Sequence, residues 1–130
     1  MFRRIFLAAA LAMTMLGATP ALAATQAAYT PQALTAAQTA GKPILIAVHA
    51  PWCPVCTKQD PIVKSLTAAP EFKDMVILTV DFDSQKDVLK TLNVQKQSTL
   101  IVMRGAAEKD RSTGVSDEAA IKALLMKALS

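Results

Sequence analysis

The chain contains only two cysteines, Cys53 and Cys56, and two residues separate them. A disulfide that closes so short a loop would stabilise the fold little, because the entropy that a crosslink removes from the unfolded chain grows with loop length. A structural zinc site needs four Cys or His ligands, whereas this chain offers two Cys and one His. Reversible thiol–disulfide exchange is the chemistry that this spacing fits best.

The elements around the cysteines would position them for this exchange. Residues 44–48 form a short apolar run, which predicts a buried central strand. A helix is expected from Cys53 or Pro54 to about Leu66, with a kink at Pro61. Residues three apart lie on one face of a helical turn, so the two sulfurs can meet. Unpaired N–H groups and the dipole at the helix start favour a thiolate over a thiol, which makes the sulfur more reactive.

The rest of the chain alternates between helical and strand patterns. With 52% hydrophobic and 18% charged residues, the composition is that of a globular protein and not of a disordered one. The order of the elements predicts a single α/β domain with a central mixed β-sheet flanked by helices. The expected elements are an extended lead-in at 24–29, helices at 31–40, at 85–92 (capped by Ser84) and from 116–118 onward, and strands at 75–82, 99–103 and 108–113.

The two cysteines lie in the segment Trp-Cys-Pro-Val-Cys at positions 52–56, directly after the apolar strand. This segment resembles the active site of the thioredoxin family. Further matches at family-like spacings are Asp83, the strand start at 98–100 and Gly114. The resemblance covers nearly all of residues 24–130 and implies a thioredoxin-like fold.

The same resemblance implies roles for particular residues. Cys53 would be the exposed nucleophile and Cys56 the more buried resolving thiol, linked through a mixed disulfide with the partner. No cofactor and no bound metal are expected. The surface that contacts a substrate is expected around the sulfurs, at Trp52, Pro54, Ser98 and Thr99.

Two positions depart from the family pattern. Ser98 stands where the family usually has a cis-proline, and we expect a trans peptide because a cis bond before another residue costs about 2.5–4 kcal/mol. The loop should still face the sulfurs, and its backbone, with an N–H that proline lacks, would offer hydrogen bonds to an extended partner strand. The substitution is either tolerated or alters partner choice, redox potential or metal access. Ala47 stands where the family commonly buries an acid, so the usual base for Cys56 is missing.

His49 is the only histidine, four residues before Cys53 and on the same strand face as Ala47. It is a candidate modulator of the cysteine pKa values, as a cation that stabilises a thiolate or as a neutral acceptor of a proton. The plainer interpretation, which the sequence alone favours, is an ordinary polar side chain at a strand end. Lys58 and Asp60 are interpreted as a solvated helix face.

Residues 1–23 are typical of a secretory signal peptide. Arg3 and Arg4 precede an uncharged run at 5–16, and small residues before Ala23 suit cleavage after Ala23 or Ala24. The rival interpretation is an uncleaved membrane anchor, but the run would cover only about 18 Å of a layer about 30 Å thick. Loss of the two arginines lowers the formal net charge from +4 to +2 and leaves no basic cluster for nucleic acid.

The sequence therefore predicts a thiol–disulfide oxidoreductase that acts on protein thiols and disulfides in the periplasm. We expect a monomer with no stable membrane insertion after signal cleavage, and a membrane electron-transfer partner, because a periplasmic reductant needs an electron donor. The direction of electron flow stays open. An exported copper- or zinc-handling protein that uses the same cysteines is the first alternative, and a non-enzymatic interaction module is the second.

Overall fold

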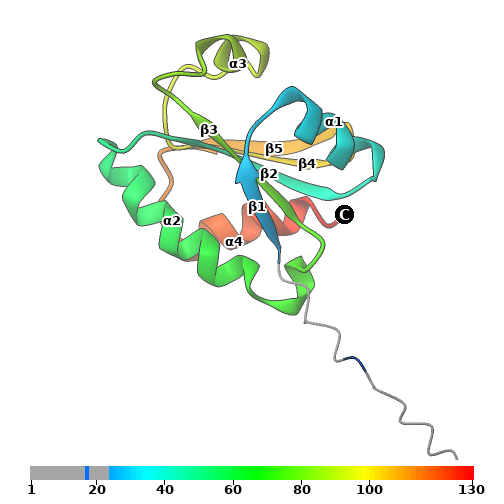
Figure 1. Ribbon diagram of the computed structural model, residues 1–130. Coiled ribbons are helices and arrows are strands. Elements are labelled where there is room, and N and C mark those ends of the chain that lie inside the picture. The colour runs from blue at the N-terminus through cyan, green and yellow to red at the C-terminus, as the bar shows by residue number, and fades with distance from the viewer. Residues whose placement is uncertain (1–16, 18–23) are drawn as a thin grey trace, which may run out of the picture.

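The computed structural model of the protein describes Gly17 and residues 24–130, so the expected signal peptide, apart from Gly17, lies outside the described residues. A five-stranded sheet in the order β1-β3-β2-β4-β5 runs through the domain, and helices lie on both of its faces (Figure 1). Within the described part of the chain, no helix has the length and apolar character needed to cross a membrane. The strands are β1 (Thr25–Ala28), β2 (Pro43–His49), β3 (Val76–Asp81), β4 (Thr99–Arg104) and β5 (Ala107–Thr113), and the helices are α1 (Pro31–Thr39), α2 (Pro54–Thr67), the 3-10 turn η1 (Pro70–Phe72), α3 (Lys86–Thr91) and α4 (Glu118–Lys127).

The sheet is mixed, which confirms the prediction from sequence. β1, β3 and β2 run parallel to one another, whereas β4 runs antiparallel to β2 and β5 antiparallel to β4. β2 is therefore the central strand, and the chain passes from it directly into the cysteine segment.

The two faces of β2 belong to two separate apolar cores. Because successive side chains of a strand point to opposite faces, Ile44 and Ile46 pack on the side of α1 and α3, while Leu45 packs on the side of α2 and α4 (Figure 1). Leu89 of α3 belongs to the first core and Ile121 of α4 to the second. The central strand is thus held rigidly from both sides, and its end is a fixed platform for the residues that follow.

Residues 24–29, expected as an extended lead-in, contain a paired edge strand. β1 lies parallel to β3, and flanking hydrogen bonds join the Thr25 N–H to the Met75 oxygen at 3.0 Å and the Tyr29 N–H to the Thr79 oxygen at 2.8 Å. All four residues of β1 are exposed. The alternation of apolar and polar residues that marks a half-buried strand is therefore absent from its sequence.

The helix after β3 does not use the predicted cap. Gln85 occupies the N-cap position of α3, and the Ser84 hydroxyl donates to the Asp81 carboxylate at 2.8 Å. The Asp83 N–H donates to the same carboxylate at 3.0 Å. The prediction of Ser84 as the cap is wrong, because its hydroxyl hydrogen-bonds to the Asp81 carboxylate within the local turn and not to the start of the helix.

Candidate active site

The chain turns from β2 into α2 at the two cysteines. β2 ends at His49 and α2 begins at Pro54, so Cys53 occupies the N-cap position. Pro54 suits the first helical position, because the N–H that proline lacks would have no partner there. Cys53 Sγ accepts a hydrogen bond from the Cys56 N–H at 3.1 Å. The two residues form a disulfide with their Cα atoms 5.3 Å apart, which confirms that the spacing brings the sulfurs together.

Both cysteines are buried, each with only 1% of its surface exposed. They form a small apolar cluster with Ala50, which Val55 and Phe82 border. The expected contrast between an exposed Cys53 and a more buried Cys56 is therefore wrong for the disulfide form, because the bond to Cys56 holds Cys53 against this cluster. In the disulfide form, little of Cys53 is therefore open to an attacking sulfur.

Trp52 lies beside the disulfide with 56% of its surface exposed. Its indole N–H donates to both carboxylate oxygens of Asp83, at 2.9 and 3.1 Å. Its ring meets Phe82 edge-on with the centroids 6.1 Å apart, and Lys86 Nζ lies 4.3 Å from the Phe82 ring centroid. Pro54 is exposed as well. These contacts hold a rigid, largely apolar platform at the sulfurs, with the amphipathic character common at protein interfaces.

Ser98 is buried and adopts a left-handed backbone conformation with φ of 60°. The described residues contain no cis peptide bond, in agreement with the expected trans peptide. The Ser98 N–H donates to the Val48 carbonyl at 2.8 Å, and Cys56 Sγ lies 3.8 Å from the same oxygen. The loop therefore faces the sulfurs as expected. The expectation that the Ser98 N–H is open to a partner strand is wrong, because this donor is used inside the protein.

Thr99 is also buried. Its hydroxyl donates to the Lys96 carbonyl at 2.8 Å and lies 3.0 Å from the Thr113 hydroxyl, which belongs to the neighbouring strand β5. Pairing of Thr99 with Thr113 at the start of β4 draws the side chain into the sheet. The side chains of Ser98 and Thr99 thus lie inside the protein, whereas the resemblance located them on the substrate surface.

Gln59 holds the loops around the disulfide and was not singled out in the sequence. It is 3% exposed, and its amide nitrogen donates to the Ser98 oxygen at 3.2 Å and to the Val115 oxygen at 2.7 Å. Its position, three residues after Cys56 and four before Val63, places it on the buried face of α2. A polar residue on an apolar helix face is the signal that could have identified it.

Replacing Gln59 with leucine is expected to lower the free energy of unfolding by about 1–3 kcal/mol, because the buried Ser98 carbonyl and the partly buried Val115 carbonyl would both lose this side-chain donor. Denaturant unfolding of the oxidised protein measures the change. Lys58→Leu is the matched control on the same helix, because Lys58 is exposed. A Gln59→Leu variant as stable as the wild type would show that the loops do not depend on this amide.

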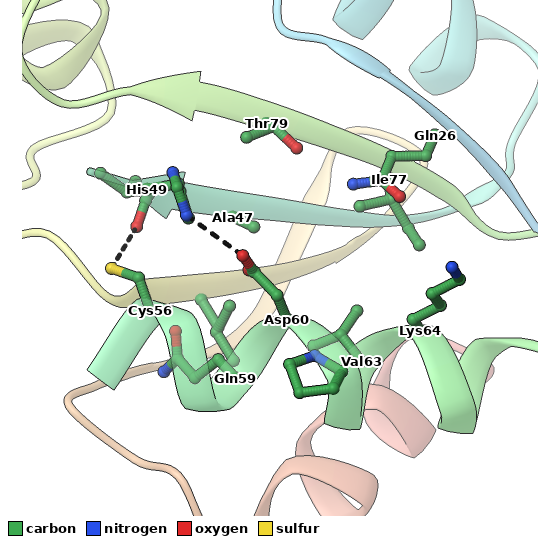
Figure 2. A pocket seen from close by; sticks show the side chains of 13 residues that line it. Gln26, Ala47, His49, Cys56, Gln59, Asp60, Val63, Lys64, Ile77 and Thr79 are labelled. Atoms are coloured by element: carbon green, nitrogen blue, oxygen red, sulfur yellow. Dashed lines mark hydrogen bonds and ion pairs between the residues drawn. The ribbon is translucent and has the colours of Figure 1, made fainter. Parts of the chain in front are cut away.

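A cavity of about 420 Å³ lies between α2 and the sheet, and Cys56 is part of its wall (Figure 2). Ala47 and His49 line it from β2, as their shared strand face requires. His49 Nε2 lies 3.1 Å from Asp60 Oδ2 of α2, with 31% and 61% of the two side chains exposed. The interpretation of Asp60 as only a solvated side chain is therefore incomplete, whereas Lys58 is exposed as expected.

Within Gly17 and residues 24–130, no group of three or more His, Cys, Asp or Glu side chains is arranged to hold a metal ion. The geometry of the described residues therefore adds no support for the copper- or zinc-handling alternative. That alternative stays a prediction, and titration of the reduced protein with each metal would test it.

Comparisons with known proteins agree with this architecture. The family model described as Thioredoxin matches residues 23–127. A thioredoxin H-type from Brassica campestris is 36% identical over 94 residues, which are 72% of this chain and 74% of that protein. A thioredoxin from Chlamydia trachomatis serovar D is 32% identical over 84 residues, 65% of this chain and 80% of that protein.

Solved structures give the same result. The crystal structure of Trxlp from Edwardsiella tarda EIB202 is 39% identical, with a TM-score of 0.76 over 78% of this chain and 98% of that one. The thioredoxin of Malassezia sympodialis, at 17% identity and a TM-score of 0.70, shares the fold over 81% of this chain and 93% of that one. The matched family model spans the sheet, the helices and the cysteine disulfide together. The chain therefore belongs to the thioredoxin family and is a thioredoxin-like disulfide oxidoreductase.

Proposed function

We propose that this oxidoreductase acts on the thiols and disulfides of proteins in the periplasm, with Cys53 as the attacking sulfur and Cys56 as the resolving one. The observation that carries these roles is the N–H of Cys56, which points at Cys53 Sγ from 3.1 Å at the start of α2. Once the disulfide is reduced, this donor and the helix dipole favour the thiolate of Cys53 over its thiol.

In the reductive direction, the Cys53 thiolate attacks one sulfur of a substrate disulfide. The substrate S–S bond breaks, one substrate sulfur leaves as a thiolate, and a mixed disulfide forms. Cys56, after losing its proton, attacks Cys53 Sγ and releases the second substrate sulfur. The protein loses two electrons to the substrate and closes its own disulfide, and the reverse sequence oxidises a substrate dithiol.

The periplasmic location rests on the amino-acid pattern of residues 1–23, and a monomer is the state we propose. A reductant in that compartment needs electrons from a membrane partner, because the periplasm is kept oxidising. Cell fractionation and the mass of the mature N-terminus test the location, with cleavage expected after Ala23 or Ala24. The reduction potential of the Cys53–Cys56 couple determines the direction of electron flow.

Replacing Cys56 with serine is expected to trap substrate proteins, because Cys53 can still attack but no second thiol resolves the mixed disulfide. Non-reducing gels of periplasmic extracts would show disulfide-linked adducts that a dithiol reagent cleaves. The Cys53→Ser/Cys56→Ser double variant is the matched control. Equal adduct levels in the single and double variants would contradict the proposed protein substrates.

A further inference from the structure

The resolving step requires a proton acceptor for Cys56, and the groups around Cys53 do not supply one. Cys56 must lose a proton before it can attack, yet its residue is 1% exposed and so has almost no contact with solvent. Its sulfur lies 3.8 Å from the Val48 carbonyl oxygen, which accepts hydrogen bonds but does not take up a proton. The cavity that Cys56 lines offers this proton a route out.

The cavity connects Cys56 to an imidazole. Figure 2 shows His49 of β2 facing Asp60 of α2, with Cys56 projecting from α2 toward β2. At about 420 Å³ it has room for several water molecules of roughly 30 Å³ each, and its walls carry polar partners for them. The polar wall residues are Gln26, His49, Gln59, Asp60, Lys64 and Thr79.

Among the polar side chains that line this cavity, His49 has a ring nitrogen with a lone pair that can take up a proton. Asp60 and Lys64 reach it from α2, and Asp81 lies opposite His49 in the β2–β3 register. The Asp81 carboxylate is already engaged by the Ser84 hydroxyl, which is the main reason that its pKa is lowered. Lys64 carries a positive charge and has no lone pair to offer.

Asp60 is the charged partner of the imidazole. Its carboxylate oxygen Oδ2 lies 3.1 Å from His49 Nε2, so the two side chains form an ion pair when the imidazole is protonated. A carboxylate beside the ring also stabilises the imidazolium that forms when the proton arrives. Because 61% of the Asp60 side chain is exposed, the pair lies between the buried thiol and bulk solvent.

We propose that His49, positioned by Asp60, takes the proton of Cys56 through the cavity during the resolving step and returns it in the reverse direction. As the proton moves to His49, the Cys56 electron pair attacks Cys53 Sγ, the Cys53–substrate bond breaks, and the substrate sulfur leaves as a thiolate. This inference rests on the proposed roles of the two cysteines. It gives the protein a proton acceptor in place of the acid that the family commonly buries at the position of Ala47.

A single-turnover reaction separates the two sulfurs. The reduced protein is mixed with a chromogenic aromatic disulfide, which releases one coloured thiolate when Cys53 attacks and a second when Cys56 resolves the adduct. The first phase depends on reagent concentration and the second does not. Both rates are measured from pH 5 to pH 8 for the wild type, His49→Gln, Asp60→Asn and the control Lys58→Gln, which changes an exposed charge on the same helix.

His49→Gln keeps a donor for Asp60 and removes the basic nitrogen. It is expected to slow the second phase at least about 10-fold at pH 7, within the range that general bases contribute, and to flatten its pH profile. The first phase should stay within about 2-fold of the wild type, because proton transfer from Cys56 comes later. Asp60→Asn should slow the second phase less, and Lys58→Gln should change neither phase.

Chemical rescue distinguishes proton transfer from a structural role. In His49→Ala, the enlarged cavity should admit free imidazole, which is expected to restore the second phase in proportion to its concentration. A second phase unchanged in His49→Gln at every pH, equal slowing of both phases, or no rescue by imidazole would each overturn the inference. A wild type that releases no second thiolate would instead overturn the proposed cysteine roles.

Discussion

Replacing Cys53 with serine is expected to abolish turnover, lowering kcat/KM for reduction of a protein disulfide by at least about 1,000-fold. A serine hydroxyl stays protonated at neutral pH and forms no disulfide, so neither the mixed disulfide nor the Cys53–Cys56 bond can form. The assay is the reduction of insulin by the protein with a dithiol as the electron source.

The same variant should stay folded, which separates lost chemistry from lost structure. Cys53 is the N-cap residue of α2, and serine is one of the preferred N-cap residues because its hydroxyl accepts the hydrogen bond that Sγ accepts now. Its thermal unfolding should therefore match that of the reduced wild type. Residual turnover close to that of the wild type would contradict the assignment of Cys53 as the attacking sulfur.

Replacing Ser98 with proline, the residue usual in the family, is expected to lower the free energy of unfolding by about 3 kcal/mol or more. The proline ring holds φ near −65°, whereas φ of Ser98 is 60°. Proline would also remove the N–H that donates to Val48 at 2.8 Å. Denaturant unfolding of the oxidised protein measures the loss.

Ser98→Gly is the matched control for this substitution. Glycine adopts positive φ at no steric cost and keeps the N–H, so its stability should lie within about 1 kcal/mol of the wild type. A proline variant as stable as the glycine variant would mean that the loop adopts the usual family conformation freely. In that case Ser98 would be a tolerated substitution and the hydrogen bond to Val48 would contribute little.

The parts that sequence could predict are those coded by neighbouring residues. The apolar run that became β2, the proline at the helix start and the spacing of Cys53 and Cys56 all act within one turn or one strand. Such patterns predicted the central strand, the helix at the cysteines and the approach of the two sulfurs, and the order of the elements predicted the mixed sheet. The edge strand β1 was not predicted as a strand, because its four residues are all exposed and carry no apolar pattern.

The parts that could not be predicted depend on groups brought together by the fold. Asp60 meets His49 across the gap between α2 and β2, and nothing in either local sequence marks the other. Gln59 reaches Ser98 and Val115, which lie 39 and 56 residues further along the chain. Burial of Cys53 likewise depends on Phe82, from a distant turn.

The Val48 carbonyl oxygen contacts both the resolving cysteine and the loop that contains Ser98. A carbonyl oxygen has two lone pairs, and here one accepts from Ser98 while the sulfur of Cys56 lies within 3.8 Å. When the disulfide opens, Cys56 gains an S–H, so the second lone pair of the oxygen acquires a donor while the first still accepts from Ser98. One backbone oxygen would therefore tie the reduced Cys56 thiol and the Ser98 loop together.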